Sequence, residues 1–303
     1  MINIQRIRKS PRIMSAMTGV TPDEFTALLS TFAQAWKEAK EKQHENNAEK
    51  RAIGGGRKGF LKTMEDKLFF ILLYAKCYPT YDLLGVIYDC NRSNACRRQF
   101  ELMNLLETTL GEKIALPQRQ MRTIEEFFQA FPEAKDLIVD GTERPIQRPK
   151  DKDKQKANYS GKKKRHTKKN IVIVEKDRRV GFLGQTVNGK THDFAILKEQ
   201  TDMDCIPKEI RKHLDLGFQG FENQFPGHEV SMPKKKPRGK ELTETEKEEN
   251  TRKSSVRIVV ENALSGIKRL NVVAHVFRNR KEGFDDQVML VACGLWNYHL
   301  SMR

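Results

Sequence analysis

The segment from Leu137 to Pro149, with the sequence LIVDGTERPIQRP, constrains the fold of this chain more than any other. Three aliphatic residues followed by an aspartate predict a short buried strand that ends at Asp140. A glycine directly after it, Gly141, predicts that the backbone turns away there. We therefore expect one carboxylate at the end of a buried strand, an arrangement that by itself indicates no function.

The charge of the chain indicates its class of partner. Its 303 residues include 56 lysines and arginines against 40 aspartates and glutamates, which gives a formal net charge of +16. A protein this basic most often binds a polyanion, and nucleic acid is the first candidate. An acidic membrane surface is the alternative, but no apolar run approaches about eighteen residues and the N-terminus lacks a signal-peptide pattern. We expect a soluble, cytoplasmic protein with no membrane partner.

The first part of the chain has helical patterns. Thr21 and Glu24 form the N-cap and N3 positions of a capping box, and three glycines at 54–56 predict a linker after this helix. Three more helices are expected between Thr63 and Leu110, with a tight turn before the third. This order favours a helix-turn-helix over residues 57–120, and an ordinary three-helix bundle with solvated arginines is the alternative. The residues expected to contact DNA are Arg92, Asn94, Arg97 and Arg98.

The second part alternates strand and helix patterns. The strand that carries Asp140 is followed by a hairpin over 170–187, a helix from 191 to about 201, strands at 210–216 and 229–232, and a helix from 243 to 270. This is the order of a ribonuclease-H-like core. We therefore expect an α/β (α+β) protein with three parts: an N-terminal helical region and linker over 1–56, the helix-turn-helix region over 57–120, and a mixed-sheet catalytic domain over 121–303.

A lysine-dense segment separates the first strand from the hairpin. Residues 148–169 are polar and predict a loop, either disordered or ordered on phosphate. Its most basic run, expected to bind the DNA backbone, is Lys162, Lys163, Lys164 and Arg165.

Three carboxylates occupy the positions that a metal site would need. In a ribonuclease-H-like core the first strand is central and the fourth lies beside it, so Asp140 and Asp215 should meet at one sheet edge. A helix packed across the sheet would add Glu261. In-line attack on a phosphodiester builds charge on the attacking and leaving oxygens, which two Mg²⁺ ions can neutralise together, with Mn²⁺ as a substitute.

The helix around Glu261 supports this arrangement. At about 100° per residue, Arg257, Glu261 and Lys268 lie together beside an apolar stripe. The two cations are then placed to contact phosphate while Glu261 binds metal. A solvated Arg257–Glu261 pair is the alternative, and it would contribute only a few tenths of a kcal/mol.

Several motifs together resemble one known family. The chain is similar to the DDE transposases of bacterial insertion sequences, in the insertion-sequence-five superfamily and its PIF/Harbinger-like group, from about Thr18 to Leu300. The motifs, in the family order, are GGGRKGFLKTMEDKL, YAKCYPTYDLLG, LIVDGTERPIQRP, YSGKKKRHTKKN, GKTHD, LDLGFQG and RIVVENALSGIKR.

The resemblance assigns roles to individual residues. It implies that Asp140, Asp215 and Glu261 are the catalytic carboxylates, and that Arg257 and Lys268 accompany Glu261. Asp193, in the GKTHD motif, is the rival for the second carboxylate, although an aspartate at a helix start is commonly a cap. Where related enzymes have a tyrosine three residues before the arginine, this chain has Ser254.

The resemblance also implies an activity. The expected protein binds the terminal inverted repeats of its own element, hydrolyses DNA with two metal ions and joins the 3′-OH ends to target DNA. It would act as a homodimer or larger assembly on DNA, associated with the bacterial nucleoid. The alternatives are an inactive or domesticated relative that only binds DNA, and a stand-alone nuclease that cleaves without joining.

Overall fold

The computed structural model describes residues 2–45, 59–237, 239 and 241–303. These residues form two compact units, which we describe separately. The helical unit contains the described residues up to Leu116 together with Arg269–Ala274 and Gln287–Arg303, and the sheet unit contains Pro117–Lys268 and His275–Asp286. The predicted linker at 54–56 lies outside the described residues, and the predicted domain boundaries stay a prediction. Among the described helices, none is long and apolar enough to cross a membrane.

The helical unit is built around α4. Residues 67–75 of this helix are buried on every side, because neighbouring helices surround it. Thr63 and Asp66 form a capping box that fixes its start. The helices of this unit are α1 (Ile4–Arg8), α2 (Pro11–Thr18), α3 (Pro22–Glu45), α4 (Met64–Cys77), α5 (Tyr81–Tyr88), α6 (Arg92–Glu112), α13 (Asn271–Ala274) and α14 (Phe284–Ser301) from Gln287 onward.

The predicted helix starts and the predicted tight turn are confirmed. Thr21 and Glu24 exchange hydrogen bonds at the start of α3, with Thr21 N donating to Glu24 Oε2 at 2.8 Å and Glu24 N donating to Thr21 Oγ1 at 3.2 Å. Between α5 and α6 the chain turns at Asp89, whose φ of 49° is in the left-handed region. A partly buried hydrogen bond of 2.8 Å from Tyr81 Oη to Gln99 Oε1 ties α5 to α6.

The sheet unit alternates strands and helices. Its elements are α7 (Ile124–Ala130), β1 (Asp136–Pro145), α8 (Lys152–Asn158), β2 (Tyr159–Ser160), β3 (Arg165–Val174), β4 (Val180–Leu183), β5 (Val187–Asn188), α9 (Asp193–Gln200), the 3-10 turn η1 (Met203–Cys205), β6 (Arg211–His213), the 3-10 turn η2 (Leu216–Phe218), α10 (Phe221–Gln224), β7 (Val230–Ser231), α11 (Glu244–Val256) and α12 (Ile258–Lys268).

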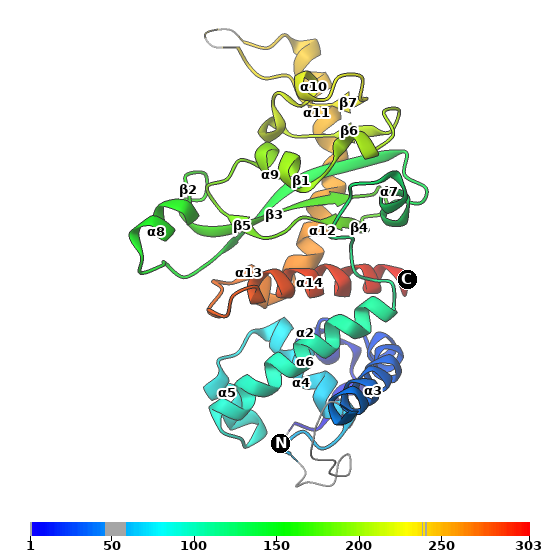
Figure 1. Ribbon diagram of the computed structural model, residues 1–303, viewed down its shortest axis with the longest axis vertical. Helices are drawn as coiled ribbons and strands as arrows, with labels where there is room; N and C mark the ends of the chain where they lie inside the picture. Colours follow the sequence, from blue (N-terminus) through cyan, green and yellow to red (C-terminus); the bar gives the residue numbers. More distant parts are fainter. Residues whose placement is uncertain (1, 46–58, 238, 240) are drawn as a thin grey trace. The chain divides into compact units, whose positions relative to one another are not determined.

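The sheet has β1 at its centre. The strand order is β2-β3-β1-β6-β7, and β4 and β5 also pair with β3. β1 is antiparallel to β3 and parallel to β6. Leu137 and Val139 of β1 pack with Ile196 of α9 in one apolar cluster, while α12 crosses the opposite side of the sheet (Figure 1). The predicted fold class is therefore confirmed: a mixed-sheet, ribonuclease-H-like core preceded by a helical region.

Two local predictions around Asp140 were wrong. β1 does not end at this residue but continues to Pro145, because β3 pairs with it from Ile138 to Pro145. Gly141 therefore lies inside a strand, and the reason for a glycine there is spatial. A Cβ atom at this position would lie 2.6 Å from Oδ1 of Asp193. Gly141 makes room for a side chain from α9 instead of turning the backbone.

The segment 148–169 is also more ordered than predicted. It contains the helix α8, the short strand β2 and the start of β3. Asp151 caps α8 by accepting a hydrogen bond of 2.8 Å from Lys154 N. The long helix predicted over 243–270 is divided as well, because α11 ends at Val256 and α12 begins at Ile258.

Candidate active site

The register of the parallel pair β1 and β6 brings the first two predicted carboxylates to the same level. Ile138 of β1 is the partner of His213 of β6. Two residues further along each chain are Asp140 and Asp215, and parallel strands advance together. Asp215 lies just beyond its strand, at the N-cap of η2. The register therefore places the two aspartates at the same level of neighbouring strands, and their role as metal ligands stays a prediction.

Each of these aspartates has one oxygen fixed by the backbone and one directed at Arg257. Oδ1 of Asp140 accepts a hydrogen bond of 2.8 Å from Gly141 N, and Oδ1 of Asp215 accepts one of 2.8 Å from Gly217 N. Nη2 of Arg257 lies 3.3 Å from Oδ2 of Asp140 and 3.8 Å from Oδ2 of Asp215. The two carboxylates therefore share a single cationic group, supplied from the break between α11 and α12.

The electrostatics of this cluster disfavour unpaired charge. Burial raises the pKa of Asp140, and the negative charge of Asp215 raises it further, whereas Arg257 acts in the opposite direction. Burial also lowers the pKa of Lys268, and the nearby Lys163 adds to this effect. A cation beside Asp140 and Asp215 relieves the repulsion between their negative charges. A phosphate beside Lys163 and Lys268 would relieve the repulsion between their positive charges.

Glu261 lies one turn after Arg257 on α12. Its backbone N–H donates to Arg257 O at 3.0 Å, and its side chain is exposed. Within the ranges that the structure describes, no three His, Cys, Asp or Glu side chains are close enough together to hold one metal ion. The structure thus brings Asp140 and Asp215 together but does not place the Glu261 carboxylate with them in such a group.

Asp193 lies on the other side of β1. Successive residues of a strand point to opposite sides of the sheet, so Gly141 and Asp140 point to opposite sides. Asp193 lies on the side of Gly141, because a Cβ atom on Gly141 would be 2.6 Å from its Oδ1. Oδ1 of Asp193 forms an ion pair of 3.0 Å with Nζ of the buried Lys169. Oδ2 of Asp193 lies 3.1 Å from the position that a Cβ of Gly217 would take, so it also borders the loop that carries Asp215.

Lys169 is a supporting cation that the sequence analysis missed. Its Nζ donates to Thr191 O at 2.9 Å and lies 3.8 Å from Oε1 of Glu143, in addition to its pair with Asp193. It therefore ties β1 and β3 to the start of α9. Lys169 shares a face of β3 with the buried Thr167 and Ile171, and this alternation along residues 165–174 is the signal that could have identified it.

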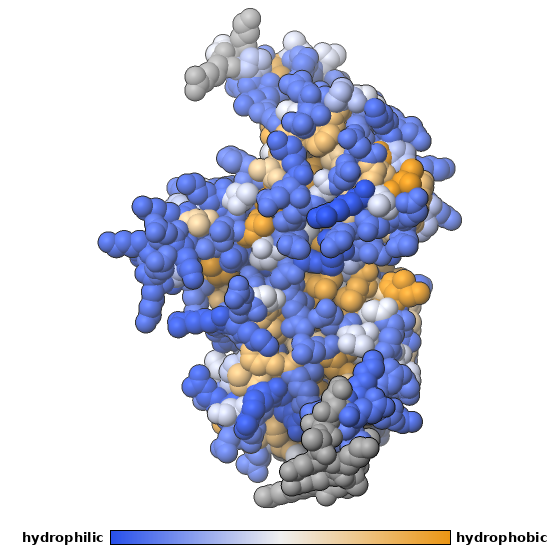
Figure 2. Space-filling model, viewed as in Figure 1, coloured by the Kyte–Doolittle hydropathy of each residue, from blue (hydrophilic) through white to orange (hydrophobic). Residues whose placement is uncertain are grey.

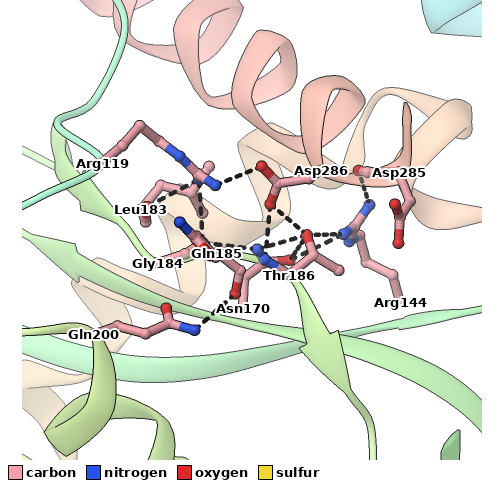
Figure 3. A network of polar contacts seen from close by, with 10 residues as sticks. All are labelled: Arg119, Arg144, Asn170, Leu183, Gly184, Gln185, Thr186, Gln200, Asp285 and Asp286. Carbon is pink, nitrogen blue, oxygen red and sulfur yellow. Dashed lines mark hydrogen bonds and ion pairs between the residues drawn. The ribbon is translucent and has the colours of Figure 1, made fainter. Parts of the chain in front are cut away.

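Arg144 is a second missed residue, and it anchors the far half of β1 (Figure 3). Its guanidinium donates to Asp285 O at 2.8 Å, to Asn170 Oδ1 at 2.9 Å and to Thr186 Oγ1 at 3.0 Å. Asp286 extends the network by accepting from Thr186 Oγ1 at 2.7 Å and pairing with Arg119 at 2.5 Å. These bonds fix β1, β3 and the first residues of α14 relative to one another within the sheet unit.

The donor set fits a hard divalent cation. Asp140 and Asp215 present carboxylate oxygens, which Mg²⁺ and Mn²⁺ prefer, and the set contains no thiolate or imidazole. Both Oδ2 atoms already face one cationic group. The residues that would hold a metal ion are therefore these two aspartates, to which the sequence prediction adds Glu261.

Apart from Arg257 and Lys268, the residues predicted to contact DNA lie in two regions of the surface. At the start of α6, Arg92 and Arg97 are exposed, and Arg97 Nη2 donates to Asn94 Oδ1 at 2.7 Å. These three residues and Arg98 line a hollow of about 1360 Å³ in the helical unit. In the sheet unit, Lys162, Lys163 and Lys164 are exposed between β2 and β3, and Arg165 is exposed at the start of β3.

Comparison with known proteins decides the family. The family model described as "DDE superfamily endonuclease" matches residues 139–297, more than half of the chain. The chain belongs to this family. The model described as "Helix-turn-helix of DDE superfamily endonuclease" matches residues 60–112, which contain α4, α5 and α6. The predicted helix-turn-helix is therefore confirmed.

The relatives of this DDE superfamily endonuclease include a curated protein of similar length. It is named "Probable transposase for insertion sequence element IS702", from Microchaete diplosiphon, and is 32% identical over 242 residues, which cover 79% of this chain and 82% of the relative. No solved structure matches the chain. Asp140, Asp193, Asp215 and Glu261 all lie inside the part that the endonuclease model matches.

Proposed function

We propose that this DDE superfamily endonuclease is the transposase of an insertion sequence of the insertion-sequence-five superfamily, PIF/Harbinger-like group. It binds terminal inverted repeats through the helix-turn-helix, hydrolyses phosphodiester bonds and joins the 3′-OH ends to target DNA. The observation that carries the proposal is the convergence of Asp140 and Asp215, from neighbouring strands, on Arg257. The relative named as a probable transposase supports it.

The chemistry requires a cation where these carboxylates meet. Two Mg²⁺ ions held there would neutralise charge on the attacking and leaving oxygens of an in-line displacement, and Mn²⁺ would serve in their place. Asp140 and Asp215 would hold the metal, and Glu261 would complete the set. Asp193 supports the site from the opposite face of β1, through its ion pair with Lys169.

The basic residues of the protein bind and orient the DNA. Arg257 and Lys268 contact phosphate beside the carboxylates, and Lys162–Arg165 bind the backbone more widely. Arg92, Asn94, Arg97 and Arg98 contact the inverted repeat from the start of α6. Two ends must be brought together for joining, so the active form is a homodimer or larger assembly on DNA, in the cytoplasm at the nucleoid.

The test is a cleavage and joining assay. The full chain is incubated with DNA that carries the inverted repeats of its element and with a second target DNA, in Mg²⁺ and in a chelator. We expect metal-dependent cleavage and a joined product. Asp140→Asn, Asp215→Asn and Glu261→Gln should each abolish both while leaving repeat binding intact.

The other outcomes define the alternatives. Repeat binding without cleavage in any divalent metal would identify a DNA-binding regulator and overturn the proposal. Cleavage without a joined product would identify a stand-alone nuclease. Loss of repeat binding on changing Arg92 and Arg97 together, with catalytic residues intact, would support the role of α6.

A further inference from the structure

A small cavity in the sheet unit combines aromatic and cationic side chains. It has a volume of about 500 Å³ and lies among α8, β2, the start of β3 and the turn after β5. The residues that line it are Arg148, Gln155, Lys156, Tyr159, His166 and Lys190. Three of them carry positive charge and none is a carboxylate. The face of the molecule over α8 is mostly hydrophilic (Figure 2).

Tyr159 supplies an exposed aromatic surface in this cavity. The residue is 45% exposed, although it belongs to a strand. It pairs across strands with His166, and the two rings meet edge to face with centroids 5.7 Å apart and an interplanar angle of 71°. His166 therefore supports the tyrosine ring without covering it.

The neighbouring guanidinium is held in a fixed orientation. Nε and Nη2 of Arg148 donate to Gln155 Oε1 at 3.1 and 2.9 Å, and Gln155 Nε2 donates to Pro149 O at 2.9 Å. The backbone of Lys190 is tied to α8 by a hydrogen bond of 3.2 Å to Ala157 O. The cavity is thus preformed, which lowers the entropy lost when a ligand binds.

We propose that this cavity binds one unpaired nucleotide of a DNA strand, with its base stacked on Tyr159 and its phosphates bound by Lys156 and Lys190. A planar, anionic ligand is what an exposed ring beside three cations recognises. The volume suits a single nucleotide, since small-ligand sites are roughly 300–1,000 Å³. A duplex presents phosphates to such a site but keeps the faces of its bases stacked, so the ring would contribute nothing.

The inference deepens the proposed function, on which it rests, and assigns a binding site for unpaired DNA apart from the carboxylates and from α6. A strand end or a locally opened duplex supplies such a nucleotide. Tyr159 provides the aromatic contact to that nucleotide.

The test compares single-stranded with duplex DNA. The full chain, in a chelator so that no DNA is cleaved, is titrated with a single-stranded oligodeoxynucleotide of about 15 nucleotides that contains 2-aminopurine, and with a duplex of the same length. We expect 2-aminopurine fluorescence to fall on binding. Tyr159→Ala should weaken single-strand binding on the order of tenfold and change duplex binding less than about twofold. Tyr159→Phe should bind both like the parent.

Two further variants separate stacking from folding. Tyr159→Leu keeps apolar bulk against His166 but has no ring face, so it should lose single-strand affinity as Tyr159→Ala does. Phe128→Ala is the matched control, because Phe128 is 46% exposed and also packs edge to face on another ring, that of Phe127 at 5.2 Å. It should leave both affinities unchanged.

The outcomes distinguish this inference from the proposed function. Single-strand affinity that is unchanged in Tyr159→Leu, or reduced equally for single strand and duplex, overturns the stacking site and leaves the transposase proposal standing. A parent protein that binds neither form of DNA overturns both. Metal-dependent cleavage of repeat DNA by Tyr159→Ala, with selective loss of single-strand binding, supports both.

Discussion

Nη2 of Arg257 lies 3.3 Å from Oδ2 of Asp140. The guanidinium thus lies beside a carboxylate oxygen that a metal ion would also bind. The same nitrogen lies 3.8 Å from Asp215. A residue expected to contact phosphate is thus paired with the two residues expected to bind metal. A DNA phosphate would bind Arg257, and a metal ion would bind the two carboxylates.

This arrangement predicts competition between Arg257 and divalent cations. Arg257→Gln should bind Mn²⁺ several-fold to about tenfold more tightly than the parent when DNA is absent, because the carboxylates lose the cation that neutralises them. Isothermal titration calorimetry of the metal-free protein measures this. Arg252→Gln, a change of an exposed arginine on α11, is the control. Equal or weaker Mn²⁺ binding by Arg257→Gln would contradict the prediction.

The same competition predicts that Mn²⁺ binding is coupled to DNA binding. If phosphate draws Arg257 away from the carboxylates, repeat DNA should tighten Mn²⁺ binding by the parent, and Mn²⁺ should tighten DNA binding by the same factor. In Arg257→Gln this mutual effect should shrink. The titrations are made with Asp140, Asp215 and Glu261 intact and with a DNA end that cannot be cleaved.

Asp140→Asn should stop cleavage and yet stabilise the metal-free protein. The loss in rate should be at least about a thousandfold, because one metal-binding carboxylate is removed. Burial raises the pKa of Asp140, so the folded state disfavours its charged form. The stability associated with the protonated form is present at low pH and is lost as the pH rises through the raised pKa. Asparagine is always neutral, so its advantage should be present at pH 7 and disappear as the pH falls through that pKa.

Thermal unfolding of parent and Asp140→Asn, from pH 7 down to pH 4 in a chelator, checks this sign. Asp153→Asn is the control for a general effect of charge, since Asp153 is exposed on α8. A parent that is more stable than Asp140→Asn at pH 7 would mean that the pair with Arg257 outweighs the cost of burial.

Asp193 and Asp215 should differ in their effects on cleavage. Asp215→Asn should abolish it, whereas Asp193→Asn should retain a measurable part, with a loss on the order of tenfold, because Asp193 acts through Lys169 from the other face of β1. Gly141→Ala should resemble Asp193→Asn, since the added Cβ would lie 2.6 Å from Oδ1 of Asp193 and displace it. Residual cleavage in Asp215→Asn with complete loss in Asp193→Asn would exchange the two roles.

The sequence predicted the elements whose signal is local. The hairpin β3–β4 follows from alternating apolar residues, the central β1 follows from a short run of aliphatic residues, and the capping box at Thr21 follows from a pair three residues apart. The meeting of Asp140 and Asp215 followed from the strand order expected of a ribonuclease-H-like core, which determines which strands are neighbours. The helix and hairpin signals, by contrast, need no knowledge of distant contacts.

The remaining features depend on contacts that no local pattern records. The space beside Gly141 is filled by Asp193 from α9, far along the chain, so the glycine was assigned to a turn. α8 has lysine at three of its seven positions and no apolar stripe, and its one local signal is the acidic cap at Asp151. The buried role of Arg144 depends on acceptors from β3 and from the start of α14.

The lysine run between β2 and β3 should control the salt dependence of DNA binding. Changing Lys162, Lys163 and Lys164 together to glutamine should reduce the slope of log K against log salt by about two to three, since each phosphate contact contributes about 0.9. The affinity for all DNA sequences should fall by the same factor. A variant with Lys37, Lys42 and Lys113 changed to glutamine has the same net charge as the first triple variant and serves as the control. Weakening confined to the inverted repeat would show that the run contacts bases.

Arg144→Lys should loosen the sheet unit without any change in net charge. The guanidinium serves Asp285 O, Asn170 Oδ1 and Thr186 Oγ1 at once, and an ammonium group has a different shape and shorter reach. Buried acceptors left without a donor should cost about 2–4 kcal/mol. Hydrogen exchange should therefore accelerate in β1, β3 and the first turn of α14, while Arg122→Lys, at an exposed position, should leave it unchanged. Because β1 carries Asp140, cleavage should fall in Arg144→Lys as exchange in β1 rises. Unaltered exchange in β1 alongside reduced cleavage would instead mean that Arg144 acts on the DNA directly.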